Sequence, residues 1–203
     1  RESLGRRLAY GPADLLDYAP ITKERVAEGG LPIETLCAAA VEVSDNTAAN
    51  LLLATLGGPE GLTRYARDLG DEVTRLDRME PALNMNAPGD PRDTTTPAAM
   101  VANLQRLLLG DALSAASRGR LEAWVVGSPT GAARIRAGLP RTWRAGGKTG
   151  TGSNGATNDV VVAWPPDRKP VLIAVYLTGS SAPLAAREAA LAEVGRVVAT
   201  DPF

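Results

Sequence analysis

The sequence predicts an α+β fold in which an all-helical domain lies beside an antiparallel sheet covered by helices. Two observations support this prediction. Residues 1–135 contain several segments with apolar residues at helical spacing, whereas residues 136–203 contain three short strand-like runs, two of them β-branched and apolar, before a last amphipathic segment. We therefore expect a mostly helical domain over residues 1–135, with residues 136–203 supplying the C-terminal strands and terminal helix of an α/β domain.

Helix-end signals divide the first region into five expected helices. Prolines in a first turn, at Pro32 and Pro97, and glycines just past an end, at Gly57 and Gly70, mark their boundaries. Thr96 stands before Pro97 as a candidate N-cap. These helices are expected over residues 31–43, 45–58, 59–70, 94–110 and 114–127.

The segment between the third and fourth expected helices has no clear hydrophobic period. Residues 74–95 hold three prolines and seven charged residues. A structureless loop of this length inside a compact domain is usually functional or disordered. Its paired opposite charges, together with Leu76, Met79 and Leu83, favour a packed Ω-loop over residues 75–95.

Three strands and a terminal helix are expected in the second region. The run "NDVVVAWP" at 158–165 is β-branched, apolar and ended by prolines, which is typical of a buried strand. The residues "PDRK" at 166–169 join it to the following strand as a hairpin loop. The strands are expected over residues 141–150, 158–165 and 170–179, and the helix over residues 183–200.

The composition excludes several classes of site. The chain has 203 residues, a net charge of −1 and no basic face that would indicate nucleic acid. No apolar run reaches the ~18 residues of a membrane span. With no histidine and one cysteine, it can build neither a histidine-based triad nor a His/Cys zinc site nor an internal disulfide, and we expect no metal and no cofactor. Acid–base chemistry must then use Glu, Asp, Lys, Tyr or Ser.

One lysine, Lys148, stands among five glycines in the stretch 145–165. A phosphate-binding loop would need glycine where Thr142 stands, and would be followed by a helix rather than by a strand. A nucleotide site is therefore not expected. Two interpretations stay open from these residues alone: a solvated lysine in a tight glycine turn, or a lysine that binds an anion other than phosphate.

Three elements of the sequence belong together: "SDN" at 44–46, "RLDRMEPALN" at 75–84 and "KTG" at 148–150. Each tripeptide alone is a weak signal, but both in this order around an acidic loop form a strong one. The chain resembles the class A serine β-lactamases over nearly its whole length, especially their broad-spectrum members from Gram-negative bacteria. The segments "DLLDYAP", "GDPRDTTTP" and "NDVVVAWP" add to the resemblance. It implies the serine β-lactamase, or penicillin-recognising, fold.

The resemblance also implies a reaction, the hydrolysis of β-lactam antibiotics through a serine acyl-enzyme. Four residues take catalytic roles in it. Glu80 is the base that activates water, and Asn84 holds the same water. Lys148 attracts the substrate carboxylate and biases the proton on Ser44, whose hydroxyl relays a proton to the leaving nitrogen.

Further residues match the substrate-binding positions of that family. Asn46 would bind the side-chain amide of the substrate, and the hydroxyls of Thr149 and Thr151 its carboxylate. The backbone N–H of Thr151 matches half of the oxyanion hole. The remaining matches are Gly150 of the KTG motif, Arg134 as support for the carboxylate site in some subgroups, and Tyr18 as an aromatic wall of the cleft.

Three residues are expected to support the site rather than to touch substrate. Asp45 fixes its turn by local hydrogen bonds, and Arg78 with Asp93 ties the Ω-loop that carries Glu80. Plainer roles compete at several positions. Ser44 would simply cap a helix, Glu80 would be a solvated loop acid, Tyr18 a surface tyrosine, and the glycines near Lys148 would only let the strand approach its neighbours.

The nucleophile of the family is absent, because no serine in the chain is followed by lysine three residues later. The resemblance places the Ser-x-x-Lys motif about twenty residues before the region aligned with Arg1, together with two strands and the first helix of the α/β domain. We expect the chain to be part of a longer protein. The alternatives are a truncated protein that cannot form the acyl-enzyme, a penicillin-binding transpeptidase or carboxypeptidase, and a non-catalytic β-lactam-binding domain.

The family also implies the setting in which the protein works. It would be a periplasmic or secreted monomer, although the sequence shows no signal peptide. Its partner would be a small β-lactam, with no nucleic acid and no membrane.

Overall fold

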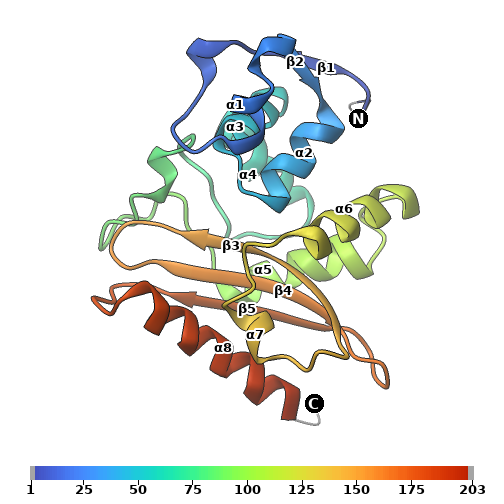
Figure 1. Ribbon diagram of the computed structural model, residues 1–203, viewed down its shortest axis with the longest axis vertical. Helices are drawn as coiled ribbons and strands as arrows, with labels where there is room; N and C mark the ends of the chain where they lie inside the picture. The colour runs from blue at the N-terminus through green and yellow to red at the C-terminus, as the bar shows by residue number, and fades with distance from the viewer. Residues whose placement is uncertain (1–2, 201–203) are drawn as a thin grey trace.

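A three-stranded antiparallel sheet and a separate group of helices lie one below the other in the computed structural model, which describes residues 3–200 (Figure 1). The predicted α+β architecture, with helices covering the sheet, is confirmed. The first region is not purely helical, however. A short strand β1, Arg7–Ala9, pairs antiparallel with β2, Gly30–Pro32, and was not predicted because three residues are too few to show alternation.

Four helices and this small sheet form the upper part of the molecule. The helices are α1 (Pro20–Glu24), α2 (Ile33–Glu42), α3 (Asn46–Thr55) and α4 (Gly58–Asp68). Their core is a cluster of buried apolar side chains: Tyr10, Leu31, Leu36, Ala39 and Ala48. This core fixes where α3 begins, and the SDN residues stand at that point.

The helix starts predicted near Pro32 and Gly58 differ from the structure by two residues and by one residue. Pro32 ends strand β2 and occupies the N-cap position of α2, so it precedes the first turn instead of lying in it. Gly57 adopts a left-handed conformation (φ 85°) and joins α3 to α4, whereas Gly58 is already the first residue of α4. Thr96 and Pro97 start α5 as predicted, and the Thr96 side chain accepts a hydrogen bond from the Ala99 N–H.

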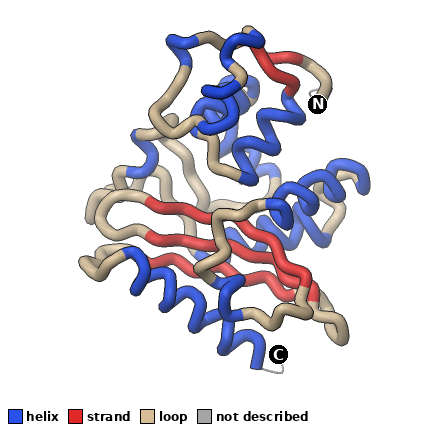
Figure 2. The backbone as a smooth tube through the Cα atoms, in the orientation of Figure 1, coloured by secondary structure: helices blue, strands red, loops and turns tan. Residues whose placement is uncertain are grey.

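The lower part is the sheet with helices on both faces (Figure 2). Its strand order is β3-β4-β5, and all three strands lie within two or three residues of their predicted bounds. The strands are β3 (Arg144–Thr151), β4 (Thr157–Trp164) and β5 (Val171–Leu177); the helices are α5 (Pro97–Leu104), its π-helical continuation Gln105–Leu109, α6 (Ala115–Gly127), α7 (Ile135–Gly138) and α8 (Leu184–Thr200).

The two faces of β4 build two separate cores. Val161 is fully buried among residues of α7 and α8, including Ile135 and Leu191. Its neighbour Val162 points to the other face and packs against Leu108 and Val125, which come from the helices after residue 96. This explains why "VVVAW" reads as a continuous apolar run: a strand covered on both faces needs apolar residues at odd and even positions. The division at residue 135 stays a prediction, and α5 and α6, which precede it, pack on the sheet.

Helix α6 lies directly on the strand that carries Lys148. A Cβ added at Gly146 would come within 2.5 Å of the Val126 nitrogen in α6, and one at Gly147 within 2.4 Å of the Val160 carbonyl oxygen. No side chain fits in either place. Gly146 and Gly147 therefore allow β3 to approach α6 and β4 closely, which is the structural role considered for these glycines. This role does not conflict with a functional role for the residues that follow them.

Candidate active site

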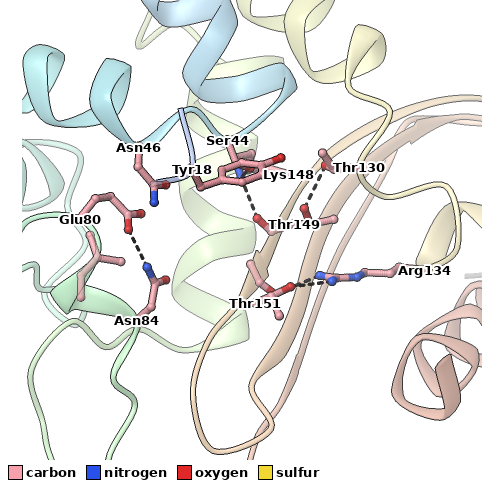
Figure 3. A pocket seen from close by; sticks show the side chains of 12 residues that line it. Tyr18, Ser44, Asn46, Glu80, Asn84, Thr130, Arg134, Lys148, Thr149 and Thr151 are labelled. Carbon is pink, nitrogen blue, oxygen red and sulfur yellow. Dashed lines mark hydrogen bonds between the residues drawn. The ribbon is translucent and has the colours of Figure 1, made fainter. Parts of the chain in front are cut away.

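A cavity of about 590 Å³ opens between the upper helices, the Ω-loop and the edge of β3 (Figure 3). All ten residues predicted for catalysis or substrate binding line it: Tyr18, Ser44, Asn46, Glu80, Asn84, Arg134, Lys148, Thr149, Gly150 and Thr151. Two further residues, Leu83 and Thr130, complete the lining. Segments far apart in the sequence thus meet at one place.

Lys148 joins the two halves of the molecule at this cavity. Its ammonium group donates a hydrogen bond to the Ser44 hydroxyl at 2.5 Å and another to the Thr149 carbonyl oxygen at 2.7 Å. The remaining donor position of an ammonium can serve a substrate anion. Burial lowers the pKa of Lys148, and the nearby Arg134 lowers it further, whereas Glu80 opposes the shift.

Glu80 lies on the opposite side of the cavity, in a half-buried position. Its Oε2 accepts a hydrogen bond from the Asn84 side-chain amide at 2.6 Å, and both side chains point into the cavity (Figure 3). Burial raises the pKa of Glu80, while the bond from Asn84 and the charge of Lys148 partly offset that effect. A carboxylate with a raised pKa is a better proton acceptor near neutral pH than a solvated one.

The backbone at Glu80 is held in place by a residue that the sequence argument missed. Asn50, in α3, accepts a hydrogen bond from the Glu80 N–H at 2.9 Å and donates one to the Glu80 carbonyl oxygen at 3.0 Å. The signal for it was present. Asn46 and Asn50 stand four residues apart, which places them on one face of α3.

The Ω-loop itself is closed by Arg78 and Asp93. The Arg78 guanidinium contacts the Asp93 carboxylate at 2.5 Å, and the exposed fractions of the two side chains are 17% and 3%. The same carboxylate also accepts hydrogen bonds from the backbone N–H groups of Asp77 and Arg78. This pair is largely buried and extensively bonded, so breaking it leaves an uncompensated charge inside the loop.

Arg134 is 4% exposed, and its guanidinium lies against the C-terminal end of β3. Its guanidinium donates to the Gly150 and Asn158 carbonyl oxygens, at 2.9 and 2.7 Å, and to the Thr151 hydroxyl at 2.7 Å. It also forms an ion pair with Glu188 on α8 at 3.2 Å. Arg134 therefore adds positive charge at Thr151, where an anion bound by Lys148 would lie.

The remaining lining residues form the walls of the cavity. Thr130 accepts a hydrogen bond from the Thr149 hydroxyl at 2.9 Å, so the loop before α7 is tied to β3 beside the site. Asn46 projects from the first turn of α3, between Glu80 and Tyr18 (Figure 3). Tyr18 is 54% exposed and still lines the cavity, so it is both a surface tyrosine and a wall. Thr130 gave no sequence signal, because it follows no helical or strand pattern.

Asp45, rather than Ser44, caps helix α3, so the simple capping role considered for Ser44 is wrong. The Asp45 carboxylate accepts a hydrogen bond from the Ala48 N–H at 2.8 Å, and others from the Ile21 and Thr22 N–H groups. Ser44 itself has φ 57°, an uncommon left-handed conformation for a residue with a side chain. The fully buried Asp45 thus frees the Ser44 hydroxyl to face the cavity and Lys148.

Asp45→Ala is expected to destabilise the protein by about 3–5 kcal/mol, because it removes a cap and leaves several buried donors unpaired. Asp45→Asn should cost less, since one oxygen can still accept. Thermal or urea unfolding measures both. Ser114→Ala, which removes the exposed cap of α6, is the control and should cost about 1 kcal/mol. Equal losses for Asp45→Ala and Ser114→Ala would show that Asp45 acts as a cap alone.

Comparisons with known proteins agree with this geometry. A profile described as the β-lactamase enzyme family matches residues 1–201. β-Lactamase AST-1 of Nocardia asteroides is 53% identical over 189 residues, which are 93% of this chain and 61% of that protein. β-Lactamase CTX-M-25 of Escherichia coli is 48% identical over 200 residues, 98% of this chain and 68% of that protein.

Solved structures show the same relationship. The ancestral (GNCA) class A β-lactamase superposes with a TM-score of 0.95 at 60% identity, covering 97% of this chain and 75% of that one. A putative class A β-lactamase, PenP from Rhodopseudomonas palustris, gives a TM-score of 0.96 at 52% identity, covering 98% of this chain and 76% of that one.

The chain belongs to the class A β-lactamase family. It spans about three fifths of the length of the Nocardia relative, 61%. Over residues 3–200, no helix has both the length and the apolar character needed to cross a membrane.

Proposed function

We propose that the enzyme containing this chain hydrolyses β-lactam antibiotics through a serine acyl-enzyme. One observation supports this most directly. A half-buried Glu80, bonded to Asn84, faces a Lys148–Ser44 pair across a single cavity. Glu80, on one side of the cavity, can accept a proton from a water molecule. On the other side, the Lys148 ammonium stands beside the Ser44 hydroxyl, which can donate a proton.

The chemistry of a β-lactam accounts for the binding groups. The substrate carries a carboxylate, a strained amide and a nitrogen leaving group. Lys148 supplies the charge that attracts the carboxylate, and the Thr151 hydroxyl donates a hydrogen bond to it. The Thr149 hydroxyl donates a second one when it turns away from Thr130. Arg134 supports the same anion from behind Thr151, through the bond at 2.7 Å. Asn46, with its amide in the cavity, binds the side-chain amide of the substrate.

Proton transfers use the two titratable pairs. In acylation the Ser44 hydroxyl relays to the departing nitrogen the proton that the attacking serine releases, and the positive charge of Lys148 at 2.5 Å favours this transfer. In deacylation Glu80 takes a proton from the water that attacks the ester, and the Asn84 amide orients that water. The backbone N–H of Thr151 provides half of the oxyanion hole that stabilises the tetrahedral intermediate.

The nucleophile comes from residues outside the 203 of this chain, because no serine here is followed by lysine at the third position. Two features of the fold leave room for further polypeptide. Strand β5 pairs only with β4 among the described residues, so its other edge can accept a strand. A second cavity of about 410 Å³ lies beside the first and shares Lys148, Thr149 and Gly150 with it.

The setting follows from the same proposal. The enzyme is periplasmic or secreted, acts as a monomer, and has a small β-lactam as its only partner. A transpeptidase of the same fold is the runner-up, but such an enzyme has no need of a base that removes its acyl group. Glu80, held by Asn50 and Asn84, favours the hydrolase. A β-lactam-binding protein without turnover is the third possibility.

The decisive experiment uses a chromogenic cephalosporin with two proteins: the complete enzyme, which includes the Ser-x-x-Lys segment, and the 203-residue chain alone. The complete enzyme is expected to hydrolyse the cephalosporin with multiple turnovers. The chain alone is expected to give none, because binding groups without a nucleophile form no covalent intermediate. A stable adduct in the complete enzyme would favour the transpeptidase, and binding without adduct the binding protein. Turnover by the chain alone would reveal a different nucleophile.

A further inference from the structure

Asp159 is a buried carboxylate on β4, the strand that pairs with the Lys148-bearing strand β3. The proposed reaction gives it no role. It is the third residue of β4, opposite Thr149 in the strand register, and is 1% exposed. Its Oδ2 accepts a hydrogen bond from the Ile135 N–H at 3.2 Å, whereas its Oδ1 is buried without a partner among the described residues. A half-satisfied buried carboxylate costs stability, and such exceptions are expected where function requires them.

The charged groups near Asp159 are mostly cationic. Helix α8, which packs on β4, carries Arg187, bonded to Thr157, and Glu188, paired with Arg134. Lys148 on β3, Arg134 and, on α7, Arg136 act on the Asp159 carboxylate. Burial nevertheless outweighs their attraction and raises the pKa of Asp159 to about 6. The carboxylate is therefore mostly ionised at neutral pH, at a cost to the folded state.

The hydrogen bond from Ile135 connects Asp159 with the cavity. Ile135 is the first residue of α7 and is fully buried, and Arg134 immediately precedes it. The Arg134 guanidinium reaches Thr151 from this backbone position, and the Asp159 carboxylate helps to hold that position by accepting from the next N–H. Asp159 does not line this cavity itself; it is linked to the cavity by the backbone next to Arg134 and by its charge, which acts to raise the pKa of Lys148.

We propose that Asp159 is a positioning residue for recognition of the substrate carboxylate: it anchors the start of α7 and thereby holds Arg134 against Thr151. The proposal rests on the proposed function and names a contributor to binding that lies outside the cavity. Loss of the Asp159 carboxylate should therefore weaken binding only of substrates that carry the carboxylate. A loss of general packing would instead impair every substrate alike.

The test compares a cephalosporin with its carboxylate methyl ester, using the complete enzyme. Asp159→Ala is expected to raise KM for the free acid about 10-fold and to change kcat less than about 3-fold, with little effect on the ester. Arg134→Ala should likewise raise KM for the free acid more than KM for the ester. The double variant Asp159→Ala, Arg134→Ala should be no worse than Arg134→Ala alone, because both changes break one chain of contacts.

Asp159→Asn separates positioning from stability. The asparagine oxygen can still accept from Ile135, so KM for the acid should rise only a few-fold. Because the pKa of Asp159 is raised from its usual 3.8 to about 6, the wild type loses stability relative to this variant as the pH rises from about 4 to about 6. Asp159→Asn should therefore be the more stable protein at pH 7 while binding the acid less well.

The matched control is Asp71→Asn, which alters another buried carboxylate, 4% exposed and bonded to Thr74 and Asn103 outside the cavity. It should leave the ratio of acid to ester KM unchanged. Equal losses on acid and ester for Asp159→Ala, or additive effects with Arg134→Ala, would overturn the positioning role. If the wild type binds cephalosporin without hydrolysing it, the proposed function fails, and dissociation constants for the acid and ester then test Asp159 in place of KM.

Discussion

Glu80→Ala in the complete enzyme is expected to accumulate an acyl-enzyme. The variant keeps Lys148 and Ser44, so acylation can proceed, but it lacks the carboxylate that takes the proton from the attacking water. Deacylation should slow by about 10²–10⁴-fold, the usual loss for a general base. The adduct should be visible by intact mass after brief mixing with a cephalosporin.

Substitutions of residues that support Glu80 should slow deacylation less than Glu80→Ala does. Asn84→Ala should resemble a milder Glu80→Ala, because it removes the group that orients the water and donates to Glu80 at 2.6 Å. Arg78→Ala should act indirectly, by loosening the loop that its contact with Asp93 closes. Its defect should therefore appear together with a lower unfolding temperature, which Glu80→Ala need not show.

The pH profile provides an independent check on Glu80. Its pKa is raised by burial, so activity should fall as the pH drops through that raised value and the base becomes protonated. This acid limb should appear in kcat when deacylation limits turnover. Wild-type turnover by Glu80→Ala, with no trapped adduct, would make Glu80 an ordinary loop acid and would place the base elsewhere in a working hydrolase.

The helices and strands could largely be predicted from the sequence, whereas most contacts between them could not. The α+β class, the three strands and the cap at Thr96 follow from local patterns, because periodicity and helix-end chemistry act within a few residues. The bond between Lys148 and Ser44 joins residues 104 positions apart, and no local pattern reports such a contact. The sequence could name both residues only because two short motifs occur together.

Contacts that depend on tertiary packing left at most a partial signal, such as the spacing that places Asn46 and Asn50 on one face of α3. The support of Glu80 by Asn50 and of Thr149 by Thr130 arises where loops meet elements distant in sequence. The capping role that competed with a catalytic role for Ser44 is excluded for a related reason. A serine and an aspartate are both good caps, and the choice between them was decided by Thr22 and Ile21, whose N–H groups bind the Asp45 carboxylate.

Lys148→Ala is expected to lower kcat/KM for a cephalosporin by about 10²-fold or more. The change removes a charged hydrogen-bond donor to the substrate carboxylate, worth about 1.5–3 kcal/mol, and also removes the charge that favours proton release from Ser44. The methyl ester of the same substrate should lose less, because only the second effect applies to it. Steady-state kinetics on the acid and ester measure the two contributions separately.

Lys148→Arg is the matched control, since it keeps the charge in a bulkier group. Burial lowers the pKa of Lys148, so in the wild type KM for the acid should rise as the pH increases through that lowered value and the ammonium loses its proton. Arginine stays protonated throughout this range, so the basic limb should disappear from Lys148→Arg even if its overall activity is reduced. A basic limb that persists unchanged in Lys148→Arg would assign the titration to another group and would remove Lys148 from the role of anion anchor.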